Sequence, residues 1–178
     1  MSMLTPRIES FVCMLALLLL LTFKSSGKYQ SSEGQSSCID CPPGYSCPVN
    51  SMDKVVCDPG YVSEAKAAVC DPCPGGKYQP NSGQSECLEC EAGYECPPGS
   101  IDQNICVAGT YSELGAASCA QCDAGRSTNG RTAQSECTLC PPGFSTERFT
   151  GSATCTICEG NFYNEEAGAP ECTPCARG

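Results

Sequence analysis

Pairs of cysteines with two residues between them are the groups in this sequence whose type and spacing could carry chemistry. Two pairs separated by roughly 12 to 14 residues have the spacing of a zinc ribbon. A single pair on a βαβ frame is typical of a thiol–disulfide oxidoreductase. Seven such C-x2-C pairs occur, at Cys38/Cys41, Cys70/Cys73, Cys87/Cys90, Cys119/Cys122, Cys137/Cys140, Cys155/Cys158 and Cys172/Cys175.

Three observations favour a structural role for these cysteines. The chain contains no His, the pairs overlap along the chain instead of forming separate sets of four ligands, and no βαβ pattern surrounds them. Without His there is also no candidate base for a nucleophile. We therefore expect no enzyme activity, no catalytic residue, no cofactor and no metal site, with thiolate metal binding as the weakest alternative.

The N-terminal segment predicts export from the cell. Residues 11–23 are apolar and Leu-rich, a length that suits the core of a signal peptide and is too short for a comfortable membrane span. Ser25, Ser26 and Gly27 are small residues that follow it. We expect a signal peptide over residues 1–27, cleavage after Gly27, no membrane span in the mature chain, and an oxidising extracellular location.

Composition predicts a fold held by crosslinks. The chain has 19 cysteines and no Trp, and it is poor in Val, Ile, Leu and Phe, so apolar burial cannot offset chain entropy. An even number of cysteines, 18, remains once Cys13 leaves with the signal peptide. The net charge of −10 argues against nucleic acid as a partner.

A 49-residue period repeats the cysteine pattern, so that Cys38, Cys41, Cys47, Cys57 and Cys70 correspond to Cys87, Cys90, Cys96, Cys106 and Cys119. Pro-Gly turns punctuate short polar stretches that can pair as two-stranded ribbons. We predict a small disulfide-rich fold, an elongated tandem array of short β-hairpin and loop modules with little regular secondary structure. The predicted parts are an incomplete first unit over residues 28–40, compound repeats over 41–73 and 90–122, a simple repeat over 73–90, three simple repeats over 122–175, and the start of a truncated unit at 176–178.

The compound repeats leave the disulfide pairing open. Four cysteines allow three pairings, and in the second repeat these are 90–96 with 106–119, 90–106 with 96–119, or 90–119 with 96–106. The first is slightly favoured because residues 106–119 resemble a simple unit. The disulfide cysteines of the compound units are Cys41, Cys47, Cys57, Cys70, Cys90, Cys96, Cys106 and Cys119.

An aromatic residue follows the turn glycine of most units, and we expect these rings to pack over the neighbouring disulfide; the alternative is an aromatic ladder that binds a ligand. They are Tyr45, Tyr61, Tyr78, Tyr94, Tyr111, Phe144 and Phe162.

The unit C-x-x-G-x-Y…G-x-x-x-C-x-x-C resembles the ephrin-receptor-like cysteine-rich repeat, also called GCC2/GCC3. It is carried here by Cys73, Gly76, Tyr78, Gly83, Cys87 and Cys90, and by Cys106, Gly109, Tyr111, Gly115, Cys119 and Cys122. The unit is also similar to the first loop of tumour necrosis factor receptor modules. By that resemblance, Cys73 pairs with Cys87, Cys122 with Cys137, Cys140 with Cys155 and Cys158 with Cys172.

The resemblance implies a secreted extracellular structural or interaction protein with a matrix, adhesion or spacer role, and an extracellular protein or matrix component as partner. The alternative is a soluble receptor-like binder or decoy for a protein ligand. If the simple units close locally, Cys38 and Cys175 have no partner within the chain. We therefore also expect that these two cysteines link chains into a disulfide-bonded dimer or stay as thiols, or else that the full-length chain continues past Gly178.

Overall fold

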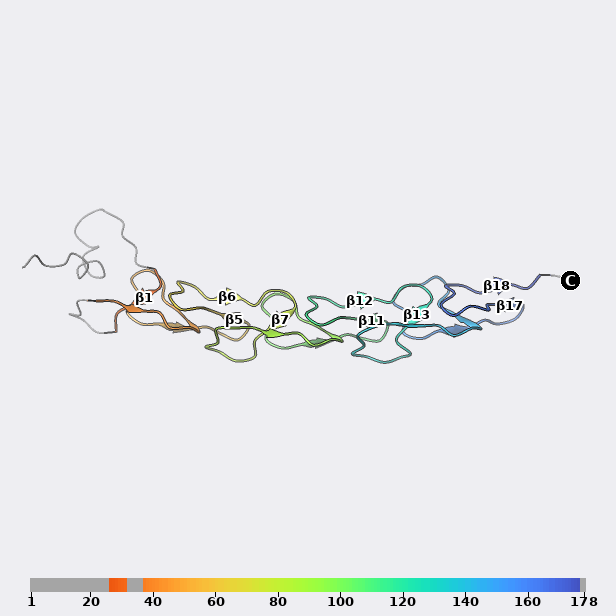
Figure 1. Ribbon diagram of the computed structural model, residues 1–178, viewed down its shortest axis with the longest axis horizontal. Coiled ribbons are helices and arrows are strands. Elements are labelled where there is room, and N and C mark those ends of the chain that lie inside the picture. Colours follow the sequence, from red (N-terminus) through yellow and green to blue (C-terminus); the bar gives the residue numbers. More distant parts are fainter. Residues whose placement is uncertain (1–25, 32–36, 177–178) are drawn as a thin grey trace, which may run out of the picture. The chain divides into compact units, whose positions relative to one another are not determined.

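The structure is a computed structural model that describes residues 26–31 and 37–176. Most of the predicted signal peptide, and residues 177–178 of the predicted truncated unit, lie outside the described residues. In the described part all regular elements are two-residue strands, which pair in sequence order as nine antiparallel hairpins (Figure 1). The predicted fold class, a disulfide-rich tandem array of short hairpins, is confirmed.

The strands are β1 (Lys28–Tyr29), β2 (Ile39–Asp40), β3 (Tyr45–Ser46), β4 (Val55–Val56), β5 (Tyr61–Val62), β6 (Asp71–Pro72), β7 (Lys77–Tyr78), β8 (Leu88–Glu89), β9 (Tyr94–Glu95), β10 (Asn104–Ile105), β11 (Thr110–Tyr111), β12 (Ala120–Gln121), β13 (Arg126–Ser127), β14 (Thr138–Leu139), β15 (Phe144–Ser145), β16 (Thr156–Ile157), β17 (Phe162–Tyr163) and β18 (Thr173–Pro174).

The described residues divide into two compact units, one formed by those up to residue 73 with 79–87 and the other by residues 74–78 with those from 88 onward. Each contact described below lies within one of these two units.

A proline–glycine turn starts the β15/β16 hairpin and shows how the others begin. Phe144 donates its backbone N–H to the carbonyl of Pro141 at 3.1 Å. Pro142 fixes φ at the second turn position, and Gly143 supplies the positive φ of +81° that the third position of a type II turn requires. The carbonyl of Gly143 then accepts a hydrogen bond from Cys158, the residue after the second strand, at 2.8 Å.

The second strand of a hairpin, which we call the return strand, is in seven cases the pair of residues inside a C-x2-C motif. Both residues of every return strand are exposed. The cysteine that follows the return strand, which we call the opening cysteine, starts the next hairpin. Because two residues separate the cysteines of a C-x2-C motif, the return strand within the motif has two residues and is flanked by cysteines.

Each predicted compound repeat contains two hairpins. The return strands β4 and β10 are preceded by Lys54 and Gln103, where the other hairpins have a cysteine. The opening cysteines of these two hairpins, Cys41 and Cys90, bond instead to the cysteine six residues further on, Cys47 and Cys96. In these two hairpins the disulfide therefore lies at the beginning of the loop, whereas in the other hairpins that contain one it lies at the end of the loop.

The residue six positions after the opening cysteine links each hairpin to the one before it. It is a cysteine in β3/β4 and β9/β10, and a polar residue in the other hairpins that follow an opening cysteine. Thr146 accepts a hydrogen bond through its hydroxyl from the backbone N–H of Gly125 at 2.7 Å, and both groups are buried. Ser112 donates its hydroxyl to the carbonyl of Tyr94 at 2.7 Å, and its own carbonyl accepts from the N–H of Gly93 at 2.9 Å.

A second contact joins hairpins that are two places apart. A Cβ atom on Gly125, the turn glycine of β13/β14, would lie closer than 3.0 Å to the carbonyl oxygen of Gly168, which belongs to the loop of β17/β18. The same relation holds for Gly27 with Lys66, Gly44 with Gly83, Gly76 with Gly115, Gly93 with Ala133, and Gly109 with Gly151. The loop residue has a left-handed backbone in all six cases.

The interior of the described residues contains half-cystines and small polar side chains. The buried apolar residues are all cysteines: Cys41, Cys47, Cys57, Cys73, Cys90, Cys96, Cys106, Cys122, Cys137 and Cys140. The buried polar residues are Ser46, Ser63, Gln79, Ser112, Ser127, Thr128, Ser145 and Thr146. No buried side-chain N or O atom in the described part lacks a hydrogen-bond partner. Crosslinks and hydrogen bonds thus occupy the place of an apolar core.

Candidate functional site

The disulfides use nearly all the cysteines of the described chain. In the simple hairpins the structure joins Cys73 to Cys87, Cys122 to Cys137, Cys140 to Cys155 and Cys158 to Cys172. In the compound repeats it joins Cys41 to Cys47, Cys57 to Cys70, Cys90 to Cys96 and Cys106 to Cys119. That arrangement is the first of the three pairings that the sequence left open.

The two cysteines expected to lack partners differ from each other. Cys38 is disulfide-bonded, so the expectation that it lacks a partner is wrong. Cys175 is exposed and is a free thiol. Its backbone N–H donates to the carbonyl of Asn161 at 2.6 Å. In other hairpins the opening cysteine donates the corresponding hydrogen bond to the carbonyl of a turn glycine.

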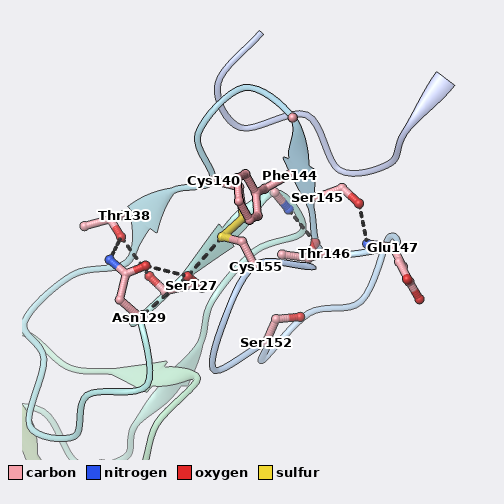
Figure 2. The surroundings of a disulfide bond; sticks show 12 residues. Ser127, Asn129, Thr138, Cys140, Phe144, Ser145, Thr146, Glu147, Ser152 and Cys155 are labelled. Carbon is pink, nitrogen blue, oxygen red and sulfur yellow. Dashed lines mark hydrogen bonds between the residues drawn. A yellow bond between two sulfur atoms is a disulfide. The ribbon is translucent and has the colours of Figure 1, made fainter. Parts of the chain in front are cut away.

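The surroundings of the Cys140–Cys155 disulfide are polar and closely packed (Figure 2). The hydroxyl of Ser127 lies 3.2 Å from the sulfur of Cys155 and is fully buried. Beside it, Asn129 donates its side-chain N–H to the hydroxyl of Thr138 at 2.9 Å. Because Cys140 is also fully buried, the disulfide is a structural crosslink, with Cys140 shielded from a reaction partner.

The outer face of the hairpins carries cross-strand pairs. The first residue of β3 and of β9 is a tyrosine, and it stands opposite an exposed aliphatic residue of the return strand: Tyr45 opposite Val56, and Tyr94 opposite Ile105. Directly opposed residues of an antiparallel pair project to the same face and contact each other. The tyrosine rings are therefore half-buried parts of an exposed apolar surface.

Other hairpins carry charge or different apolar pairs at this position. Phe144 stands opposite Ile157, whereas Lys28 stands opposite Asp40 and forms an ion pair with it at 3.2 Å. The hydrogen bond from Lys28 lowers the pKa of Asp40. The same two positions thus carry an aromatic–aliphatic pair in some hairpins and an ion pair in another.

A surface pocket of about 500 Å³ lies over the return strand β16 and the Cys158–Cys172 disulfide. Its apolar wall consists of Ile157 and Phe162, which are 54% and 51% exposed. The carboxylates of Glu147, Glu159 and Glu171 also line it. Glu171 pairs with Arg148, and this hydrogen bond lowers the pKa of Glu171 and raises that of Arg148.

Among residues 26–31 and 37–176 there is no group of three or more His, Cys, Asp or Glu side chains that could hold a metal ion. A search of the same residues for a helix long and apolar enough to cross a membrane finds none.

Residues 60–106 match the family model described as tyrosine-protein kinase ephrin type A/B receptor-like. The matched segment runs from the turn glycine of β5/β6 to the opening cysteine after β10, so it spans the second hairpin of the first compound repeat, the simple unit, and the first hairpin of the second compound repeat. No curated protein matches the chain.

Proposed function

We propose that this chain, which carries an ephrin-receptor-like cysteine-rich repeat, is a secreted extracellular protein that spaces and presents interaction surfaces in a matrix or adhesion role. The observation that carries the proposal is the contrast between buried and exposed positions within the hairpins. Every buried apolar position in the described part is a cysteine, whereas both residues of every return strand are exposed.

The exposed apolar pairs are the best candidates for contact with a protein partner. Tyr45–Val56 and Tyr94–Ile105 occupy corresponding places 49 residues apart, so the chain presents one combination of side chains twice. Aromatic residues surrounded by polar ones are common in the centre of protein interfaces. A spacer without a binding role has no need of an exposed aliphatic residue at these places.

A binding assay tests this proposal. The chain is expressed from its own N-terminus in a eukaryotic cell, and the oxidised protein is purified from the medium. It is then added to cell-free extracellular matrix and to intact cells. We expect saturable retention that falls at least about tenfold in the double variant Val56→Asp with Ile105→Asp, because two apolar contacts are lost.

The matched control changes the other position of the same two strands, Val55→Asp with Asn104→Asp. These residues are exposed and stand opposite Ser46 and Glu95, on the other face of each hairpin. The control should bind like the natural chain. Equal loss in both double variants, or no retention of the natural chain on either surface, would contradict an interaction role for this face. Capture of a soluble ligand without binding to matrix or cells would favour the receptor-like or decoy role.

The oxidation state provides an independent test. Thiol titration of the denatured secreted protein should find few thiols per chain, with Cys175 among them unless it links two chains. Electrophoresis without reductant, with Cys175→Ser as control, separates these two results. Many thiols together with bound zinc would instead support a metal-binding protein.

A further inference from the structure

The disulfides provide a covalent path along the chain that is shorter than the backbone. In a simple hairpin such as β15/β16, the bond of Cys140 to Cys155 bypasses the first strand and the whole loop. The path then follows only the return strand β16, and a strand is already extended. A pulling force along the chain therefore finds no loop to straighten in such a hairpin until a disulfide breaks.

The hairpins β3/β4 and β9/β10 differ, because their disulfides end before the loop. In β9/β10 the crosslinks end at Cys96 and resume at Cys106, so residues 97–105 lie outside any disulfide. In β3/β4 residues 48–56 do the same. Each segment has nine residues and contains the loop and the return strand of its hairpin. Fully extended, the chain between the two flanking cysteines reaches at most about 35 Å.

Single side chains hold these two loops at the place where other hairpins have a cysteine before the return strand. The side-chain oxygen of Gln103 accepts a hydrogen bond from the backbone N–H of Glu91 at 2.6 Å, in an exposed position. At the corresponding place of β3/β4, the ammonium of Lys54 lies 4.5 Å from the ring centre of Tyr45. Such contacts are far weaker than a covalent bond, and a two-stranded hairpin is only marginally stable without one.

The apolar pairs that we propose as partner contacts lie on these same two hairpins. Tyr45 stands opposite Val56, and Tyr94 stands opposite Ile105. In each pair the tyrosine precedes the segment without crosslinks, and the aliphatic residue is the last member of that segment. Straightening of the segment therefore moves the two side chains apart.

We propose that β3/β4 and β9/β10 are extensible hairpins, which open under tension without cleavage of a disulfide and thereby release a partner bound to their apolar pairs. The release rests on the proposed function, whereas the extension does not. In a hairpin closed by a disulfide, tension cannot separate the corresponding pair. Phe144 and Ile157, for example, stay opposite each other because the bond of Cys140 to Cys155 joins the bases of their two strands.

Force spectroscopy on single chains tests the extension. The secreted, oxidised chain carries Cys175→Ser and a handle at each end, and it is pulled in the absence of reductant. We expect at least two reversible steps that each lengthen the chain by at most about 35 Å. Gln103→Ala should raise the opening rate of one step at least about twofold at constant force, because the hydrogen bond that closes its loop is lost.

Relocation of one disulfide supplies a locked variant. Cys96→Ser with Gln103→Cys lets Cys90 bond to the new cysteine at a separation of 13 residues, the same separation as in the bond of Cys106 to Cys119. The serine has a precedent at the same place of another hairpin, six positions after the opening cysteine, where the chain has Ser112. This variant should lose one extension step.

The matched variant of the other hairpin, Cys47→Ser with Lys54→Cys, should lose the second step, and the chain with both locks should lose two. Peptide mapping without reductant verifies each relocated bond. Where a bond has not relocated, the opening rate of Gln103→Ala decides. A natural chain without such steps, or variants that change neither the number of steps nor their rates, would overturn the proposal.

Binding under tension tests the release. Single chains are stretched between their end handles, and beads coated with cell-free extracellular matrix are added. For the natural chain we expect attachment to fall at least about tenfold between rest and the force at which the two steps occur. The chain with both locks should bind equally at the two forces. An equal loss in both chains overturns the release, and no attachment at rest contradicts the proposed function while the extension steps stand by themselves.

Discussion

The carbonyl oxygen of Gly168 lies so close to Gly125 that a Cβ atom on Gly125 would approach it within 3.0 Å. The two residues are 43 positions apart and belong to hairpins that are separated by a third, β15/β16. The hydroxyl of Thr146, in that intervening hairpin, accepts the N–H of Gly125. Gly125 is therefore held by two hairpins at once, and changes there should affect more than a local turn.

Replacement of this glycine should destabilise the chain more than replacement of its counterpart. Gly125 and Gly143 have similar positive φ values, +82° and +81°. The left-handed backbone alone costs a side chain about 1–2 kcal/mol, which is the full loss expected for Gly143→Ala. Gly125→Ala adds a backbone clash and should lose more than about 3 kcal/mol. Urea unfolding of the oxidised proteins measures both, and equal losses would show that the close approach to Gly168 is not rigid.

The hydroxyl of Thr146 should contribute to stability through a single hydrogen bond. Thr146→Val keeps the shape and leaves the buried N–H of Gly125 without an acceptor, which costs about 1–3 kcal/mol. Thr146→Ser retains an oxygen and should recover most of that loss. Hydrogen exchange at Gly125 is the direct measurement: we expect faster exchange in the Val variant only. Similar exchange in both variants would contradict the assigned bond.

Stability should depend on oxidation, because the described chain buries no aliphatic or aromatic side chain. Removal of the Cys122–Cys137 bond by paired Ala substitutions opens a separation of 15 residues and should cost about 3 kcal/mol. The Cys41–Cys47 bond spans 6 residues, and its loss should cost about 2 kcal/mol in the same model. Full reduction should unfold the chain. Circular dichroism and protease resistance that survive reduction would contradict this.

The pKa of the Glu171 carboxylate should depend on Arg148. Hydrogen bonding to Arg148 lowers the pKa of Glu171 in the folded chain below its unfolded value. The pair therefore adds a small stabilisation above the unfolded pKa, which disappears as the pH falls through the folded pKa. An NMR titration of side-chain carboxyl carbons measures the pKa of Glu171. Arg148→Gln should raise the pKa of Glu171 to its usual range. An unchanged pKa would show that the two side chains do not interact.

Signal cleavage should fall before Gly27, one residue or more earlier than the sequence alone predicts. The N–H of Gly27 donates to Cys47 at 3.0 Å, and its carbonyl accepts from Cys41 at 2.9 Å. A mature chain beginning at Lys28 lacks both bonds and the turn of the first hairpin. We therefore propose that Gly27 is retained. Mass spectrometry of the N-terminal peptide of secreted protein decides the point, and a start at Lys28 would show that the first hairpin forms without this turn.

Several elements could be predicted from the sequence because the forces that create them act over short distances. The turns expected from the Pro-Pro-Gly sequences at Pro42 and Pro141 are present. The structure also contains the bonds of Cys73 to Cys87 and Cys140 to Cys155, which the resemblance to tumour necrosis factor receptor modules implied. The polar residues six positions after the opening cysteine were missed, although Ser and Thr recur there, because nothing local shows that they are buried.

The sequence by itself determined that the chain depends on disulfides, repeats with a 49-residue period and has no aliphatic core, since composition and spacing fix all three. Only the tertiary structure decided which residues each turn contacts. The Pro-Pro dipeptide before Gly44 predicts a turn, but nothing in it shows that a Cβ atom on Gly44 would clash with the carbonyl of Gly83. That clash depends on how hairpins two places apart lie against each other, and packing geometry at that range leaves no signal in the local pattern of residues.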